Sequence, residues 1–200
     1  MRHIVAFVIM LSAFSASAAQ AEGGRVEIHG GYDRLDYDSF FSPSDSTFKP
    51  TEGAVLGASL SYDIPISGPL FAGIEANADF ATGSRCQVNP LVLAPGIFES
   101  CLSLKRDLGA NARIGVNLAN DRTRLYALAG YSNLLLETSF QINRQPPTSL
   151  RSETRDGLRL GVGIEHDFGK RFYGKIEYRY TDYGSGIARS QGLVGAGLRF

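Results

Sequence analysis

Histidines are the first side chains in this sequence that could carry out chemistry, and residues 22–200 contain only His29 and His166. His29 stands two residues from Glu27, so in a strand the two side chains would lie on the same face. A histidine beside a carboxylate can act as a general base. The more ordinary role of such a pair, and the one we expect, is membership of a buried polar network.

A second group of reactive side chains consists of charged residues at alternate positions within otherwise apolar segments. Its members are Glu75, Arg113, Arg159, Glu165, Lys175, Glu177 and Arg179. Their signs nearly balance, and an unpaired charge is very costly to bury. We therefore predict that they form an ion-pair network inside the fold, and we expect no catalytic residue, metal or cofactor.

The first 21 residues have the pattern of a secretory signal peptide. Arg2 and His3 precede an apolar run that extends from Ile4 to Phe14, and small residues lead to Ala21. A transmembrane anchor would need about 18 to 20 apolar residues, which this run does not supply. We expect cleavage after Ala21, with the bond after Ala18 as the alternative.

Export changes the interpretation of the two cysteines, because an oxidising compartment favours a disulfide over a metal site or a catalytic thiol. Cys86 and Cys101 are predicted to pair, the alternative being two free thiols. The stretch between them contains Pro90, Pro95 and Gly96 and is predicted to be a long loop.

Strands must position these side chains, because most of residues 22–200 alternate between apolar and polar positions with a period of two. Seven segments show this alternation: 25–32, 54–64, 70–80, 108–118, 158–168, 172–180 and 194–200. An additional segment, 124–136, is apolar at both parities, so it is predicted as a strand without an assigned inward face.

The eight predicted strands are joined by connections that alternate strictly in length. The short ones are 65–69, 120–123 and 169–171, and the long ones are 36–50, 81–103, 137–153 and 184–190. Short turns at one end and long loops at the other are typical of a transmembrane β-barrel. The fold class predicted for residues 22–200 is all-β, an eight-stranded antiparallel up-and-down barrel.

The alternatives are a soluble sandwich and a lipocalin-like barrel, whose polar face would be bulky and richly charged. Here that parity mixes charges with glycine, and the apolar parity carries no charge through the strand centres. Lipid enforces such an exclusion, since Arg or Lys on the lipid face costs roughly 2–4 kcal/mol at the midplane. Twenty basic residues against 20 acidic ones leave no basic surface, so a nucleic-acid partner is not expected.

The last two strands, Gly174–Gly184 and Val194–Phe200, resemble those of small eight-stranded outer-membrane proteins of Gram-negative bacteria. This group is opacity-protein-like and OmpA-barrel-like, and is often labelled porin family. The resemblance implies an outer-membrane location among membrane lipids and lipopolysaccharide. It also implies that the terminal Phe200 is part of the signal read by the outer-membrane assembly machinery. The Cys86–Cys101 pair departs from the family pattern.

Barrels of this size serve as anchors, adhesins, small channels and lipid-modifying enzymes, so the fold does not fix the function. An enzyme would need its nucleophile and base at the long-loop end, where neither histidine is predicted. Eight strands leave an interior that side chains can fill, which disfavours a pore, although inward glycines leave room for water and small ions. We predict an envelope component that displays its loops to an extracellular ligand, with a low-conductance channel as the alternative.

Overall fold

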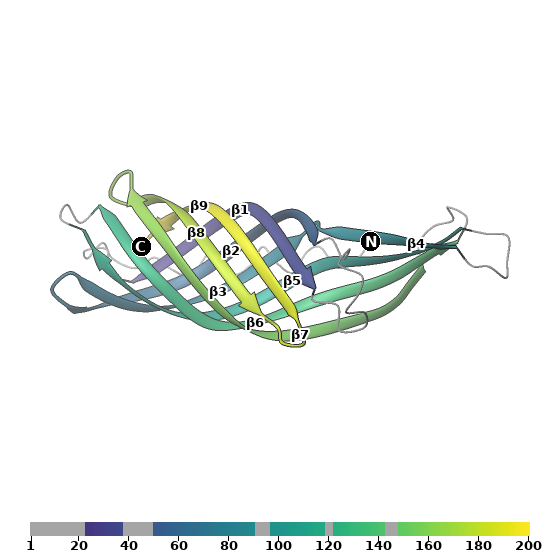
Figure 1. Cartoon of the computed structure of the whole chain (residues 1–200). Coiled ribbons are helices and arrows are strands. Elements are labelled where there is room, and N and C mark those ends of the chain that lie inside the picture. Colours follow the sequence, from purple (N-terminus) through teal and green to yellow (C-terminus); the bar gives the residue numbers. More distant parts are fainter. Residues whose placement is uncertain (1–22, 38–49, 91–96, 119–121, 143–147) are drawn as a thin grey trace, which may run out of the picture.

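The computed structural model describes residues 23–37, 50–90, 97–118, 122–142 and 148–200 (Figure 1). The predicted signal peptide lies outside the described residues. Nine strands are present in them: β1 (Gly24–Tyr37), β2 (Thr51–Ser67), β3 (Leu70–Ala81), β4 (Ser84–Pro90), β5 (Ile97–Asn117), β6 (Thr123–Ile142), β7 (Thr148–Asp167), β8 (Phe172–Asp182) and β9 (Ile187–Arg199). The described residues include no helix long and apolar enough to cross a membrane.

The strands close into a barrel in which every neighbouring pair is antiparallel. β1 pairs with β2 on one side and with β9 on the other, and the pairing of β3 with β5 completes the ring. β4 continues β3 after a two-residue break at Thr82 and Gly83, so β3 and β4 count as one strand of the barrel, which is therefore eight-stranded. Closure pairs the backbone groups that an open sheet edge would leave unsatisfied in lipid. The predicted eight-stranded transmembrane barrel is confirmed.

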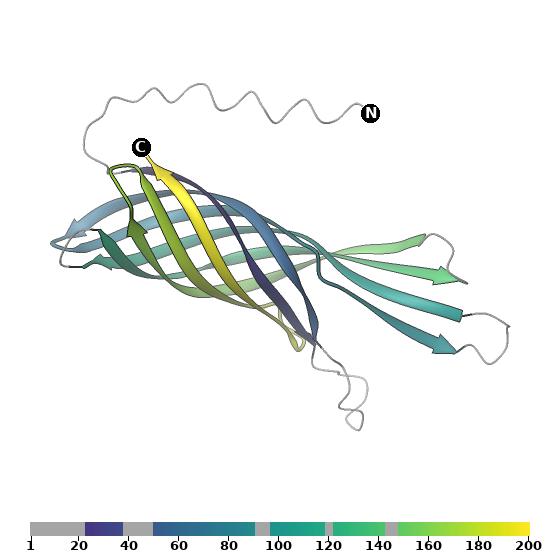
Figure 2. The same cartoon turned by 90° about the horizontal axis from the view of Figure 1, so that it is seen from above.

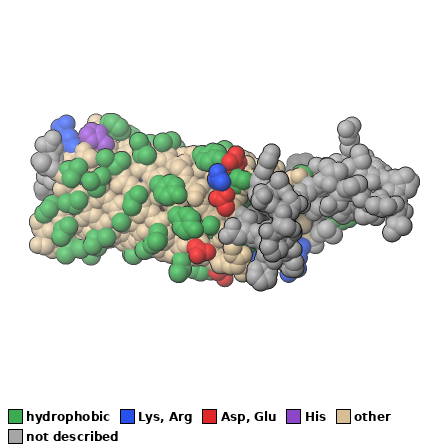
Figure 3. Space-filling view, in the orientation of Figure 1, with side chains coloured by type: hydrophobic (Ala, Val, Ile, Leu, Met, Phe, Trp, Pro, Cys, Tyr) green, Lys and Arg blue, Asp and Glu red, His purple; other side chains and the backbone are tan. Residues whose placement is uncertain are grey.

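The alternation in the sequence separates an apolar outer wall from a polar interior. Leu56, Leu158 and Ile28 point outward and are 69%, 74% and 68% exposed, whereas Arg159 and Arg179 point inward and are fully buried. Hydrophobic side chains are spread over the face of the wall seen in Figure 3, and the acidic ones lie towards one end of it. This inversion of the usual soluble pattern suits a wall that contacts lipid.

Exposed aromatic side chains lie near both ends of the outer wall, as expected for interfacial girdles. Those at the end with the short turns are Tyr62, Phe168, Phe172 and Phe200, and those towards the other end are Tyr32, Phe80 and Tyr180. We call the first end the short-turn end. It holds Gly23 and Phe200, the turns at residues 68–69 and 168–171, and Leu118 and Arg122 beside the ends of β5 and β6.

The inward face of β6, which the sequence left open, consists of its even-numbered residues. Tyr126 and Leu128 are 5% and 3% exposed. A Cβ atom added to Gly163 would lie 2.4 Å from the Tyr126 ring, and one added to Gly161 would lie 3.0 Å from the Leu128 side chain. The inward glycines of β7 therefore accommodate large neighbours, and the prediction that they leave space for water is wrong at these positions.

Two of the predicted long loops are largely strand. β4 pairs with β5 over residues 84–90 and 97–103, and β6 pairs with β7 over residues 136–140 and 148–153. Pro90 suggested a loop, but it stands at the end of β4. β4 is an edge strand that pairs with β5 on one side, and an edge strand tolerates a proline, which has no backbone N–H to donate. Figures 1 and 2 show β4 and the ends of β5, β6 and β7 extending beyond the rest of the barrel. We call this extension, residues 84–90, 97–104, 136–142 and 148–157, the projecting sheet.

The predicted long connection at 184–190 is a tight turn, because β8 ends at Asp182 and β9 begins at Ile187. Gly184, Ser185 and Gly186 have φ values of 70°, 53° and 73°. Three successive residues with positive φ are tolerated here because two of them are glycines, which have no Cβ atom to clash. Of the long connections, 36–50 falls mostly on residues outside those described.

A register shift in β5 lies where the projecting sheet meets the barrel. Leu104 pairs with Leu136 and Asp107 with Leu134, so Lys105 and Arg106 together take the place of one residue. The shift reverses the parity of β5: Leu108 faces outward, yet Leu104 faces inward and is 2% exposed. Such bulges redirect side chains.

Candidate functional site

The interior of the barrel holds many buried ion pairs, beside two small apolar clusters. Among the described residues, seven buried Arg or Lys side chains accompany eight Asp or Glu side chains and His29. They form three levels along the barrel axis, and all seven residues that the sequence assigned to an ion-pair network lie among them.

The level nearest the short-turn end is centred on Glu165. Arg25 donates to both of its carboxylate oxygens at 2.7 and 2.8 Å, Arg113 donates at 2.7 Å and Arg199 at 2.8 Å. Arg25 also contacts Asp63 at 3.3 Å. Three guanidinium groups on one carboxylate from different strands tie opposite parts of the wall together.

The middle level is centred on Arg179, which is fully buried. It contacts Glu75 at 3.1 Å, Asp79 at 3.3 Å and also Glu177. Lys175 contacts Glu177 at 3.2 Å and so joins the same level.

His29 belongs to this middle level. Its Nδ1 lies 3.2 Å from Glu27 Oε1 and its Nε2 lies 2.7 Å from Asp79 Oδ1. An ionised carboxylate only accepts hydrogen bonds, so both ring nitrogens are placed to donate, as in an imidazolium. A positive His29 also balances the seven cations and eight acids of the interior. The histidine is a buried partner in a polar network and lies away from the surface.

The level towards the projecting sheet joins Arg159 and Arg189 through Asp107. Arg159 Nη2 contacts Asp107 Oδ2 at 2.5 Å, and Arg189 contacts the same oxygen. Arg189 also binds Asp33, at 2.7 and 2.9 Å. Ser132 donates to Asp107 at 2.6 Å.

Above this level an apolar cluster closes the interior. Leu35, Leu104, Leu134, Leu136 and Tyr183 pack together, each of them at most 8% exposed. We call this cluster the leucine plug. A continuous aqueous path through the barrel would have to pass both the plug and the three levels of ion pairs.

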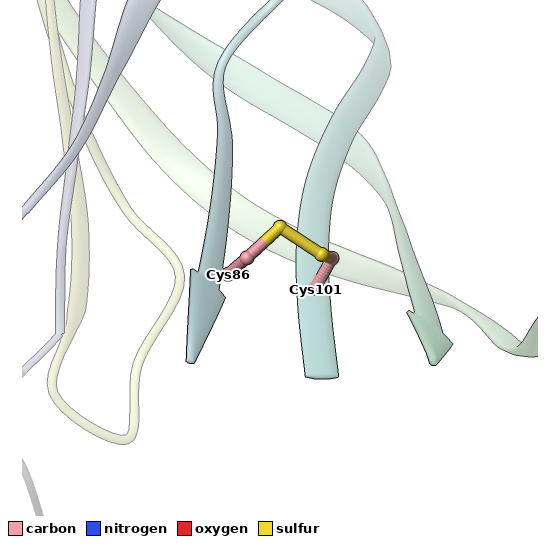
Figure 4. Close-up of a disulfide and its surroundings, with 2 residues drawn as sticks. All are labelled: Cys86 and Cys101. Atoms are coloured by element: carbon pink, nitrogen blue, oxygen red, sulfur yellow. A yellow bond between two sulfur atoms is a disulfide. The ribbon is translucent and has the colours of Figure 1, made fainter. Parts of the chain in front are cut away.

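A disulfide links two strands of the projecting sheet. Cys86 and Cys101 are directly opposite in the β4–β5 ladder and are bonded to each other (Figure 4). The bond therefore reinforces a hairpin that backbone hydrogen bonds also hold, rather than closing the irregular loop that the sequence suggested.

Polar groups mark the outer wall at the base of this sheet. Tyr131 and Asn133 donate to Asp156 at 2.5 and 2.6 Å, and the Tyr131 hydrogen bond lowers the pKa of that carboxyl. The apolar outer wall ends at this height.

Several members of the network were missed from the sequence, for identifiable reasons. Asp107 was missed because the bulge in β5 breaks the alternation just before it. Arg189 was missed because it was assigned to a loop. Asp33, Asp63 and Asp79 stood on the polar parity and could have been included on that signal.

Phe200 lies at the short-turn end, where its backbone N–H donates to Gly24 O at 3.0 Å and its carbonyl accepts from Gly24 N at 3.1 Å. The last strand is thus joined to the first up to its final residue. The role of Phe200 in assembly stays a prediction. His166 points outward at the same end, with its Nδ1 2.9 Å from the Thr123 hydroxyl.

A closed barrel with an apolar outer wall, aromatic girdles and a charged interior defines a transmembrane β-barrel of the outer-membrane class. The family model described as outer membrane protein beta-barrel domain matches residues 6–200, so the chain belongs to this family. The family supports an outer-membrane location. No curated protein matches the sequence.

Solved structures of the same fold include three small outer-membrane proteins. Ail, the attachment invasion locus protein of Yersinia pestis, solved with the heparin analogue sucrose octasulfate, has 16% identity and a TM-score of 0.53, with 90% of this chain and 99% of that chain covered. Neisserial surface protein A has 14% identity and a TM-score of 0.57, with 88% and 97% covered. OprG of Pseudomonas aeruginosa has 14% identity and a TM-score of 0.51, with 91% and 98% covered. At these identities the likeness shows the fold alone.

Proposed function

We propose that this protein is a structural component of the outer membrane that displays the projecting sheet to an extracellular ligand. The observation that carries the proposal is the contrast between the two parts of the molecule. The interior of the barrel is filled by paired charges and closed by the leucine plug. The described part of the chain that extends beyond the barrel is the projecting sheet.

The orientation follows from topology. Because the barrel has an even number of strands, its first and last residues both lie at the short-turn end, which faces the periplasm in this class. The projecting sheet then stands outside the cell. The signal peptide, residues 1–21, is removed on export, the wall contacts membrane lipids and lipopolysaccharide, and Phe200 presents the last strand to the assembly machinery.

Two further observations support an adhesive role over the alternatives. Ail was solved in complex with the heparin analogue sucrose octasulfate, which supports a loop-displayed ligand site in a barrel of this fold. A lipid-modifying enzyme would need a base near the outer leaflet, whereas His29 is buried among Glu27 and Asp79. A low-conductance channel would require the ion pairs and the plug to open.

The proposal is tested by removing the tip of the projecting sheet. In one variant a short turn replaces residues 87–100, and in a matched control a short turn replaces residues 38–49. Cells producing each form are compared for attachment to heparin-coated and matrix-coated surfaces, after gel mobility has shown that both barrels fold. We expect the first variant to lose attachment and the control to keep it.

Planar-bilayer recordings separate this role from transport. We expect at most small, irregular currents from the purified protein. Regular steps of porin size, or attachment that does not depend on residues 87–100, would contradict the proposal.

A further inference from the structure

Two adjacent cations stand on the outer wall at the bulge of β5. Lys105 and Arg106 lie between Leu104 and Asp107, which both face inward. Consecutive residues of a regular strand point to opposite faces, and a bulge changes that arrangement. Lys105 faces outward, since its Nζ lies 3.4 Å from Oε2 of Glu137, which stands on the outward parity of β6.

Arg106 faces outward as well. It is directly opposite Phe80 in the β3–β5 ladder, and residues that are opposite each other share one face of the sheet. Phe80 is 65% exposed and belongs to the aromatic girdle at the end away from the short turns. Because such girdles lie at the level of the lipid headgroups, the bulge places two positive charges side by side at that level.

The two cations differ in what balances them. Lys105 has Glu137, whereas Arg106 makes no hydrogen bond or ion pair with any described residue. Its neighbour Asp107 is buried on the inner side, where Arg159 and Arg189 bind it. Arg106 is therefore an outward cation that the described part of the chain leaves without a counter-ion.

The acids farther round the wall are already engaged. Asp36 and Glu52 both contact Arg34, at 2.9 and 3.9 Å. They stand on β1 and β2, and β3 separates them from β5. The counter-ion of Arg106 is thus to be sought outside the chain.

The position of Arg106 selects the kind of molecule that supplies this counter-ion. Towards the short-turn end the wall beside it is apolar: Leu108 is 42% exposed, and Ala78 lies opposite Leu108 on β3. A molecule that fits both surfaces has apolar chains and an anionic headgroup, as a membrane lipid has. The anionic group of such headgroups is a phosphate, which a guanidinium binds through two parallel hydrogen bonds.

We infer that Lys105 and Arg106 form a binding site for a phosphate group on the membrane anchor of lipopolysaccharide, a phosphorylated glycolipid with several acyl chains. The choice of this lipid rests on the orientation proposed above, which puts the bulge in the extracellular leaflet. Arg106 supplies the bidentate contact, and Lys105 adds a second positive charge. Lipid binding by the purified protein does not involve the tip of the projecting sheet, so this inference and the adhesive role fail separately.

The probe is diphosphoryl lipid A, titrated into the folded, full-length mature protein in non-ionic detergent micelles, and native mass spectrometry counts the bound lipid. The comparison ligands are lipid A without its phosphates, phosphatidylglycerol and inorganic phosphate. We expect saturable binding of diphosphoryl lipid A and at least tenfold weaker binding of the phosphate-free form. Phosphatidylglycerol should also bind more weakly, because its phosphodiester carries less charge than a phosphate monoester. Inorganic phosphate, which has no chains to contact the wall, should not bind at the same concentration.

Arg106→Gln should weaken binding of diphosphoryl lipid A about tenfold, because a charge-assisted contact is lost. Arg106→Lys keeps the charge without the planar fork and should recover part of the affinity. The matched control is Arg151→Gln, which removes a 74% exposed arginine from the projecting sheet and should leave lipid binding unchanged. Lys105→Gln is a second test if Arg106→Gln fails to give the gel mobility of a folded barrel, and it should also weaken binding.

The inference is overturned if the phosphate-free lipid binds as tightly as diphosphoryl lipid A, or if Arg106→Gln and Arg151→Gln lose the same affinity. Equal binding of phosphatidylglycerol would contradict the choice of lipopolysaccharide. Tight binding of inorganic phosphate would show that the acyl chains have no part in the site, and the absence of saturable binding would leave Arg106 as a solvated surface charge.

Discussion

Replacing Arg179 by methionine tests whether the charged interior holds the barrel together. Arg179 is fully buried, and the change removes one partner each from Glu75, Asp79 and Glu177. Removing one partner from a buried ion pair costs about 3–5 kcal/mol, because the other charge is left uncompensated.

The three losses should not add up, since each acid keeps another partner. Glu177 retains Lys175 at 3.2 Å, Glu75 retains Arg113 at 3.7 Å, and Asp79 retains His29 at 2.7 Å. We therefore expect Arg179→Met to lower the free energy of unfolding by about 3–5 kcal/mol in total.

The measurement is equilibrium unfolding of the protein from lipid vesicles in guanidinium chloride, followed by circular dichroism. The control is Arg151→Met, because that side chain is 74% exposed and pairs with Glu153 on the surface. An exposed pair contributes about 0–1 kcal/mol. Adding Glu177→Gln to Arg179→Met should recover part of the loss. A loss no larger than that of Arg151→Met, or a double variant less stable than the single one, would refute the reasoning.

Leu160→Arg, on the lipid face, should lower stability in bilayers by roughly 2–4 kcal/mol, whereas Gly192→Ala, where an added Cβ atom meets nothing within 4 Å, should change little; the same unfolding assay distinguishes them, and equal effects would mean that the wall does not face lipid. Reduction of the Cys86–Cys101 bond should increase protease cleavage of the projecting sheet on intact cells while the barrel stays folded, since the bond joins only β4 and β5; loss of the folded gel mobility would contradict this. The imidazole ¹⁵N signals of His29 should show protons on both nitrogens at neutral pH, because both contact carboxylate oxygens; the signature of a neutral ring would be evidence against the charge balance of the interior.

The barrel could be predicted from the sequence because a wall between lipid and a charged interior leaves a period of two in nearly every strand. In β6 both parities are apolar, so the alternation does not predict which face points inward. That face is set by the glycines of β7, which leave room for Tyr126 and Leu128. Those contacts depend on register between strands, which the sequence of one strand does not contain.

Seven members of the interior network were named from the sequence, but others, such as Asp107 and Arg189, were not, and none of the pairs was. Glu165 gathers Arg25, Arg113 and Arg199 from strands that are distant in sequence. The hairpins of the projecting sheet were missed because prolines and small polar residues suggest loops, while cross-strand pairing decided the structure.

The bulge at Lys105 and Arg106 gives β5 two phases of alternation. On one side of it, even-numbered residues such as Leu108 meet lipid; on the other, the even-numbered Leu104 faces the plug. The change from the barrel wall to the projecting sheet is thus marked in β5 by a shift of its alternation by one residue. Deleting either residue of the bulge would bring the two phases into step and turn Leu104, the plug residue that β5 supplies, outward. A single-codon deletion there would therefore take one leucine out of the plug, although it would remove no residue of the plug itself.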